Sequence, residues 1–226
     1  MARPAPRAPH RAPYAKRLVI LAKSPALGRV KRRLGRQIGD VAALRFYRAC
    51  LAHIVLRLAP DRRWRTLIAV TPDRDAAPAP AWCARAPRRP QGNGDLGCRM
   101  QRLANDLPPG PLVIVGGDIP ALKAGMIQAA FARLGGADVV FGRAHDGGYW
   151  LVGLKRMPKV LRPFGAVRWS TPHALDDTLA NLAGKRIAYV ETLSDVDTEA
   201  DWRCERSHAE RLVLSDNMTR PLVAFN

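Results

Sequence analysis

The stretch VIVGGDIPAL, residues 113–122, decides the fold class that we expect for this chain. An apolar run enters two glycines, and Asp118 with a proline follows at once, so that an acid stands where a strand would end. The stretch DVDTEAD, residues 195–201, places two more acids after another apolar run. Ligands of open α/β sheets bind where the strands end. The two stretches therefore predict a shared site built from Asp118, Asp195 and Asp197.

Three carboxylates at one site repel each other unless a cation binds between them. Two of them 4 Å apart repel by about 4 kcal/mol at an effective dielectric constant near 20. A divalent ion relieves that repulsion, and hard oxygen ligands suit Mg²⁺ or Mn²⁺. We therefore expect Asp118, Asp195 and Asp197 to be metal ligands.

Strand-like runs alternate with helical patterns along the rest of the chain. We expect strands at Leu18–Leu21, Thr66–Thr71, Leu112–Val115, Asp138–Phe141, Tyr149–Leu154 and Arg186–Val190. We expect helices from a cap at Asp40 to Leu58, over Met126–Leu134 and around His173–Leu182, and a long loop over Pro72–Pro90. This order predicts a mostly parallel sheet covered on both faces, which is a three-layer α/β/α sandwich.

Length and composition suit one globular domain. The chain has 226 residues, of which 47% are apolar, and no apolar run approaches the roughly 20 residues that span a bilayer. Residues 1–15 are rich in Pro, Ala and Arg and are expected to be a disordered arm. The main folded domain is expected over 16–205 and a tail over 206–226. Four scattered cysteines indicate free thiols and a cytoplasmic location.

The net charge of +18 is concentrated near the start, where residues 1–39 hold eleven Lys and Arg and no acid. Such a block is typical of proteins that bind phosphate, nucleic acid or an acidic surface. A biased genome composition explains it equally well. A polynucleotide partner is the least favoured explanation, because aromatic residues are only 6% and no nucleic-acid-binding motif is present.

Three loops carry candidate ligand contacts. AKSPALGRVKRRL, residues 22–34, can surround phosphates with Lys23, Gly28, Arg29, Lys31 and Arg33, although solvated surface is the plainer alternative. In QGNGDLGCRM, residues 91–100, the close approach of Gly92 and Gly94 suits a nucleotide, and Gln91 suits a base or sugar. Asp95 there is either a nucleotide contact or a helix cap.

The third region lies later in the chain and suits an acceptor. DGGYWLVGL, residues 146–154, brings Gly147 and Gly148 to the start of a strand. Ser170 and Thr171 offer hydroxyl groups before a helix. Thr171 followed by a proline also fits an ordinary helix N-cap.

The motifs AKSPxxGxxKxRL, QGxGDLGxRM, GxDIPxL, DGGYxLxGL, WST and DVDTxxD stand here in that order. They resemble an uncharacterised bacterial family labelled rSAM/selenodomain-associated transferase 1 or cofC-like glycosyltransferase. The resemblance covers about residues 17–202. It implies a nucleotide-diphospho-sugar transferase (GT-A) fold, close to the 2-phospholactate and molybdenum-cofactor guanylyltransferases.

The resemblance also implies roles for individual residues. Positions matching Asp118, Asp195 and Asp197 bind the metal, the loop matching Lys23–Arg33 takes the triphosphate, and the serine matching Ser170 lies near the acceptor. Two positions depart from the family. Arg32 stands where a threonine is usual, and Arg143 stands where a proline is usual. Either these arginines add positive charge near the expected phosphates and suit a more anionic ligand, or the two changes have no functional effect.

The expected activity is transfer from a nucleotide donor, with Asp118, Lys31 and Lys23 as catalytic residues. Nucleotidyl transfer from an NTP to a phosphorylated small acceptor is favoured by the basic loop. Glycosyl transfer from an NDP-sugar is the alternative. The acidic DxD motif of such enzymes usually lies in mid-chain, whereas the DxD of this chain, Asp195 to Asp197, lies near its end. A nucleotide- or nucleic-acid-binding protein without turnover is the third hypothesis. No membrane partner is expected, and oligomeric state is open.

Overall fold

The computed structural model describes residues 14–77, 86–193 and 196–204. Seven strands form one sheet in the order β3-β2-β1-β4-β6-β5-β7. The strands are β1 (Arg17–Lys23), β2 (Arg65–Thr71), β3 (Arg88–Pro90), β4 (Leu112–Gly116), β5 (Val139–Ala144), β6 (Tyr149–Leu154) and β7 (Ile187–Leu193). Neighbouring strands pair in parallel except β6, which runs antiparallel to both β4 and β5.

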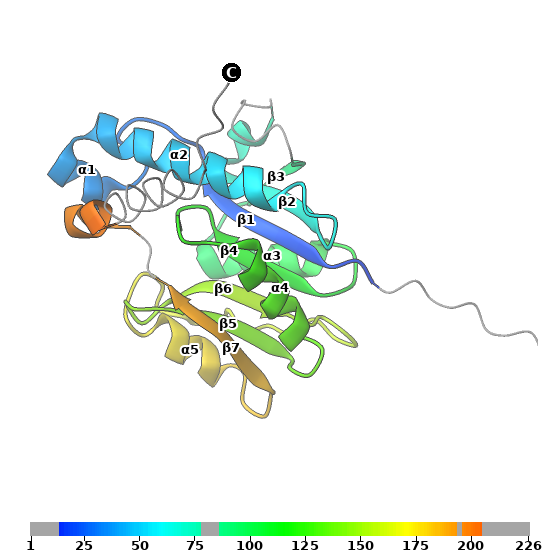
Figure 1. Ribbon diagram of the computed structural model, residues 1–226. Helices are drawn as coiled ribbons and strands as arrows, with labels where there is room; N and C mark the ends of the chain where they lie inside the picture. The colour runs from blue at the N-terminus through cyan, green and yellow to red at the C-terminus, as the bar shows by residue number, and fades with distance from the viewer. Residues whose placement is uncertain (1–13, 78–85, 194–195, 205–226) are drawn as a thin grey trace, which may run out of the picture.

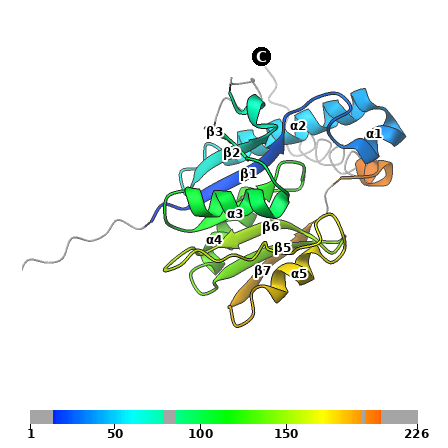
Figure 2. The same ribbon diagram turned by 180° about the vertical axis from the view of Figure 1, so that it is seen from behind.

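Helices cover both faces of this sheet (Figures 1 and 2). They are α1 (Arg32–Ile38), α2 (Asp40–Leu58), the 3₁₀ turn η1 (Asp73–Ala76), α3 (Leu96–Asp106), α4 (Ala124–Arg133) and α5 (Ala174–Ala180). Residues 199–204 are also helical. The expected three-layer α/β/α sandwich with a mostly parallel sheet is confirmed.

Alternation along β1 explains why two layers form. Leu18 and Ile20 point to one face, where α2 and α4 supply the apolar side chains of a large core cluster. Val19 points to the opposite face, into a cluster with side chains from α3 and α5. Successive strand residues alternate between faces, so an unbroken apolar run is buried on both.

Several local expectations need correction. The loop over Pro72–Pro90 contains η1 and the short edge strand β3, and the basic stretch after β1 ends in α1. Asp40 is the first residue of α2 and makes no capping hydrogen bond, because Gly39 occupies the N-cap. Helix α5 has His173 at its N-cap rather than Thr171. The predicted arm and most of the predicted tail lie outside the described residues.

Arg156 is a buried cation of this fold, with only 3% of its surface exposed. Its guanidinium donates to the carbonyl oxygens of Gly110 at 2.8 Å, Ala104 at 2.8 Å and Leu107 at 3.1 Å, and also to that of Pro108. These carbonyls belong to the end of α3 and the turn into β4. Arg156 therefore joins that turn to the segment after β6.

Cys50 is buried and Cys98 and Cys204 are exposed, and the described ranges contain no disulfide, while Cys83 lies outside them. Among the helices that the structure describes, none is long and apolar enough to cross a bilayer.

Candidate active site

Six of the seven strands point the same way, so their last residues meet at one end of the sheet, which we call the carboxyl end. Strand β6 runs the other way and starts there, because Leu151 pairs with Val115 near the end of β4. The turn between β5 and β6 and the exit of β7 also reach this end, since Leu193 pairs with Ala144. All the predicted site loops therefore lie at the carboxyl end.

Asp118 is placed by the two glycines that precede it. The Gly117 N–H donates to the Leu21 carbonyl at 2.9 Å, which joins the exit of β4 to β1. A Cβ at Gly117 would lie 2.8 Å from Leu51 Cδ1 and 3.0 Å from the Leu21 oxygen, so a side chain cannot fit. Asp118 follows at the surface with 34% of its side chain exposed.

Asp197 reaches the same place from the other end of the chain. The preceding residue, Val196, is buried with Leu34 and Ala43 in a small apolar cluster against α1 and α2. The Glu199 N–H donates to Gln37 Oε1 of α1 at 2.7 Å. Both views of the fold accordingly place the helical turn of 199–204 beside α1 (Figures 1 and 2).

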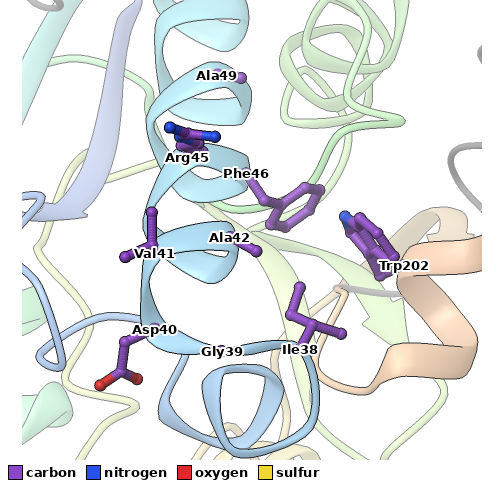
Figure 3. A pocket seen from close by; sticks show the side chains of 9 residues that line it. All are labelled: Ile38, Gly39, Asp40, Val41, Ala42, Arg45, Phe46, Ala49 and Trp202. Carbon is purple, nitrogen blue, oxygen red and sulfur yellow. The ribbon is translucent and has the colours of Figure 1, made fainter.

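A shallow groove marks this packing (Figure 3). In the close-up, Phe46 of α2 and Trp202 face each other across it, with Ile38 below them. The groove is lined mainly by apolar groups and holds none of the predicted ligand contacts. Its walls come from α1, α2 and Trp202 of the segment that carries Asp197, so it lies along the contact between them.

Asp201 shapes the turn that presents Asp197. Its Oδ2 accepts hydrogen bonds from the Asp197 N–H at 3.2 Å, the Thr198 N–H at 2.9 Å and the Thr198 hydroxyl at 2.7 Å. Burial raises the pKa of Asp201, but these hydrogen bonds outweigh burial and lower it. The acid therefore stays ionised and holds the backbone beside Asp197.

Lys31 lies between the two acids. Its Nζ is 2.8 Å from Asp118 Oδ2 and 2.8 Å from Asp197 Oδ1, and only 4% of its side chain is exposed. Burial alone would lower the pKa of Lys31, but the two carboxylates outweigh burial and raise it well above its ordinary value. The ammonium is therefore charged at any physiological pH and neutralises part of the acidic site.

The backbone at Lys31 is strained. Its φ of 45° and ψ of 48° lie in the left-handed region, which costs a non-glycine residue about 1–2 kcal/mol. Such strain collects at functional sites. The conformation turns the chain between the loop and α1 so that the Lys31 side chain points to the acids.

The other predicted phosphate contacts surround this point. Arg33 Nη1 lies 3.8 Å from Asp197 Oδ2, and its side chain is 77% exposed. Lys23 and Arg29 are exposed at the end of β1 and in the loop, and Gly28 turns the chain with a φ of 68°. The structure thus brings Lys31 and Arg33 to the acids and leaves Lys23 and Arg29 facing solvent nearby.

Tyr47 is a site residue that sequence patterns did not reveal. Its buried hydroxyl accepts the Lys23 N–H at 2.9 Å and donates to the Lys23 carbonyl at 3.0 Å. Burial and the nearby Asp118 carboxylate raise the pKa of Tyr47, so its hydroxyl stays protonated. In the sequence Tyr47 is one apolar position in the helical period of α2, and nothing there indicates a hydrogen bond.

Tyr47→Phe should lower the free energy of unfolding by about 1–3 kcal/mol, because the N–H and carbonyl of Lys23 lose their buried partner. Urea denaturation of the purified variant measures this change. Tyr14→Phe is the matched control, since Tyr14 is 42% exposed. Equal midpoints for both variants would contradict the assigned role.

The glycine-rich loop is braced from within the protein. Gln91 is 3% exposed, and its Nε2 donates to the carbonyls of Ala22 at 3.1 Å and Ala69 at 2.8 Å. Its amide nitrogen thus joins β1 to β2, and a contact of Gln91 with a base or sugar stays a prediction. Arg102 adds hydrogen bonds to the Gln91 and Asn93 carbonyls at 2.8 and 2.9 Å.

Asp95 is the N-cap of α3, which was one of its two predicted roles. Its Oδ1 accepts the Cys98 N–H at 2.7 Å. Gly92 has a φ of 79°, and a Cβ there would lie 2.2 Å from Arg102 Nη1. Its N–H donates to Asp73 Oδ1 at 3.0 Å. The loop at Gly92 and Gly94 therefore has a fixed shape at the carboxyl end.

The predicted acceptor residues come together. A Cβ at Gly147 would lie 2.2 Å from the Pro172 oxygen, and the Gly147 carbonyl accepts the Leu175 N–H at 3.2 Å. Ser170 has a φ of 62°, which is strained for a serine. Gly148 completes the turn with a hydrogen bond from its N–H to Asp146 Oδ1 at 2.9 Å.

Thr171 and Arg143 have structural partners in this region. The Thr171 hydroxyl donates to the Arg168 carbonyl at 2.7 Å and accepts the His173 N–H at 3.3 Å. The Arg143 guanidinium lies 3.9 Å from the centre of the Tyr189 ring, within cation–π range. The arginine that replaces the family's usual proline at position 143 is thus held by stacking on a side chain of β7.

The donor chemistry of the acids fits a divalent ion. Within the described ranges no three His, Cys, Asp or Glu residues are grouped closely enough to hold a metal, and Asp195 lies outside those ranges. Asp118 and Asp197 remain 34% and 38% exposed, and a carboxylate offers about four lone-pair positions. The two acids can therefore take part in binding Mg²⁺ or Mn²⁺.

This sheet and the convergence of loops at its carboxyl end define a fold of the nucleotide-diphospho-sugar transferase type. The chain belongs to the family described as "Uncharacterized protein conserved in bacteria (DUF2064)", whose model matches residues 54–171. The match includes Asp118 and both glycine-rich loops, and it excludes Lys31 and Asp197. No curated protein matches the chain in sequence.

Solved structures support the same fold. A protein from Desulfovibrio desulfuricans G20, assigned as a nucleotide-diphospho-sugar transferase, is 26% identical, with a TM-score of 0.71 over 81% of this chain and 82% of that one. Molybdopterin-guanine dinucleotide biosynthesis protein A from Archaeoglobus fulgidus is 12% identical, with a TM-score of 0.54 over 86% and 99%. Glucosyl-3-phosphoglycerate synthase from Mycobacterium tuberculosis, in complex with Mn²⁺, UDP and phosphoglyceric acid, is 11% identical, with a TM-score of 0.52 over 92% and 80%.

Proposed function

We propose that the protein is a metal-dependent transferase that uses a nucleotide donor, and that it joins an NTP to a phosphorylated small acceptor. One observation carries this proposal: Asp118 and Asp197, from distant parts of the chain, both contact Lys31 of the basic loop at the carboxyl end of the sheet. Acids for a cation and cations for a phosphate tail thus share one place, as transfer from a nucleotide requires.

The metal is assigned to the acids. Asp118 and Asp197 would hold Mg²⁺ or Mn²⁺ together with Asp195, and the ion would supply charge stabilisation at the donor phosphates. Lys23, Arg29, Lys31 and Arg33 orient the phosphate tail and neutralise its charge. No protein nucleophile is needed, because positioning and electrostatics supply most of the catalysis in phosphoryl-type transfer.

The remaining contacts are assigned by their loops. Gly92 and Gly94 present backbone to the nucleotide, and Gly147, Gly148, Ser170 and Thr171 border the acceptor. The strained φ of Ser170 supports its assignment, since left-handed serine is uncommon outside constrained sites. The arm at residues 1–15 is not needed for turnover, and its deletion should leave turnover intact.

Glycosyl transfer from an NDP-sugar is the second candidate. The relative from Mycobacterium tuberculosis with bound UDP and Mn²⁺ favours it. The basic loop favours nucleotidyl transfer, because a triphosphate carries more charge than a diphosphate and four cations stand at or near the acids.

Thermal shifts against GTP, ATP, CTP, UTP and their NDP-sugars, with and without Mg²⁺, test the proposal. We expect one NTP to stabilise the protein more in the presence of Mg²⁺ than in its absence, and Asp118→Asn to abolish this metal-dependent gain. A shift from an NDP-sugar alone would replace nucleotidyl with glycosyl transfer. No shift from any of these compounds would contradict a nucleotide-dependent transferase and leave non-catalytic binding through the basic arm.

A further inference from the structure

Lys31 stands where an ion bridging the two acids would stand. Its ammonium is 2.8 Å from one oxygen of Asp118 and 2.8 Å from one oxygen of Asp197. An Mg²⁺ ion bound to either of these oxygens at about 2.1 Å would lie at most about 5 Å from Nζ. Two cations so close repel, so the ammonium weakens the binding of a divalent ion to these oxygens.

The second oxygen of Asp197 offers no easy alternative. Oδ2 of Asp197 lies 3.8 Å from Arg33 Nη1, so both oxygens of this acid face cations. Lys31 and Arg33 both belong to the basic segment that we assign to the phosphate tail. A ligand that binds Lys31 and Arg33 therefore reduces the positive charge next to the Asp197 carboxylate.

The conformation of Lys31 also suits an exchange. Its backbone is held at a φ of 45°, where a lysine is strained, while its side chain is 4% exposed beneath the acids. Moving the ammonium to a phosphate at the surface would release the acids and keep the lysine paired with an anion. The same side chain can therefore serve two partners in turn.

We propose that Lys31 is a tethered counter-ion which bridges Asp118 and Asp197 before a nucleotide binds, and that a phosphate group must draw it away before a divalent ion can bridge them. The inference rests on the proposed function, because it takes the ligands to be a nucleotide and a divalent cation. It adds an order to their binding: phosphate first and bridging metal second. Metal alone then binds weakly.

Titration of the protein with Mn²⁺ alone, followed by the electron paramagnetic resonance signal of free Mn²⁺, tests the inference. Removing the charge in Lys31→Met should lower the Kd for Mn²⁺ at least about tenfold relative to the unmodified protein, because a cation within about 5 Å is removed. Lys31→Arg should show no such gain. Lys185→Met is the matched control, since this exposed lysine lies before β7, at the opposite end of the sheet.

Adding Asp118→Asn to Lys31→Met should abolish the gain, because the bridging pair is lost. Equal Mn²⁺ affinity of Lys31→Met and the unmodified protein would overturn the inference. If Lys31→Met does not fold, Lys31→Gly provides the same test, since glycine adopts the left-handed conformation without strain. The rise in melting temperature caused by Mn²⁺ gives a second readout and should be larger in either neutral variant.

The outcomes separate this inference from the proposed function. Equal Mn²⁺ affinities, together with metal-dependent stabilisation of the unmodified protein by an NTP, would reject the counter-ion and keep the transferase. A tenfold gain in Lys31→Met without any nucleotide shift would keep the exchange of cations at the acids and reject the nucleotide donor.

Discussion

Asp118→Asn should lower turnover with the donor identified by thermal shift by about a thousandfold. The substitution keeps the size of the side chain and removes the charge that we assign to holding the cation at the reacting phosphates, where such electrostatic groups have their largest effect. Lys31 keeps its pairing with Asp197 in this variant, so the fold should persist. Initial rates under saturating donor measure the change.

Asp106→Asn is the matched control for that measurement. Asp106 is an exposed acid at the end of α3, where it pairs with Arg89 at 3.0 Å, and it lies outside the site. Its loss should leave turnover within about twofold, since exposed ion pairs contribute little to stability. If Asp118→Asn kept more than a tenth of the normal rate, the metal assignment would be wrong.

The second large effect concerns stability rather than chemistry. Arg156→Met should lower the free energy of unfolding by about 3–5 kcal/mol, because carbonyls at the end of α3 lose their donor in a buried place. The cost of burying the guanidinium is removed at the same time, which limits the effect. Urea denaturation followed by circular dichroism measures it.

Arg133→Met separates this role from the loss of a positive charge. Arg133 is exposed in the last turn of α4, and its substitution should change stability by less than about 0.5 kcal/mol. A similar result for Arg156→Met would mean that water replaces the guanidinium at these carbonyls. Turnover per folded molecule should be normal in both variants.

Most of the sheet could be predicted from sequence because its strands are apolar on both faces. All six expected strands are present within three residues of their predicted bounds, and the burial of Leu18 and Val19 on opposite faces explains why. Strand β3, by contrast, is three residues with two arginines and a proline, which no apolar pattern marks. Its place comes from pairing with β2.

The direction of β6 could not be predicted in the same way. An apolar run such as Tyr149–Leu154 is buried whether it runs parallel or antiparallel, and only the short turn after β5 argues for a hairpin. That direction matters for the site, because it brings Gly147 and Gly148 to the carboxyl end of the sheet.

The convergence of two candidate acids could be predicted from the sequence, but the position of Lys31 between them could not. Asp118 and Asp197 follow strands whose ends meet, so their convergence follows from the topology. The position of Lys31 depends on a left-handed backbone and on Val196 packing against α1 and α2, and neither leaves a pattern in the sequence. The burial of Gln91 could not be predicted either, because a buried amide and a ligand-facing amide look alike in a glycine-rich loop.

The pairing of Lys31 with Asp197 joins residues 166 positions apart. Contacts of such long range close large loops and form late in folding. During synthesis, the strands from β1 to β7 emerge before the segment at 196–204 that completes the site. The proposed catalytic centre is therefore assembled only when nearly the whole domain has been made, and a chain cleaved after β7 would keep its sheet but lose Asp197 from that centre.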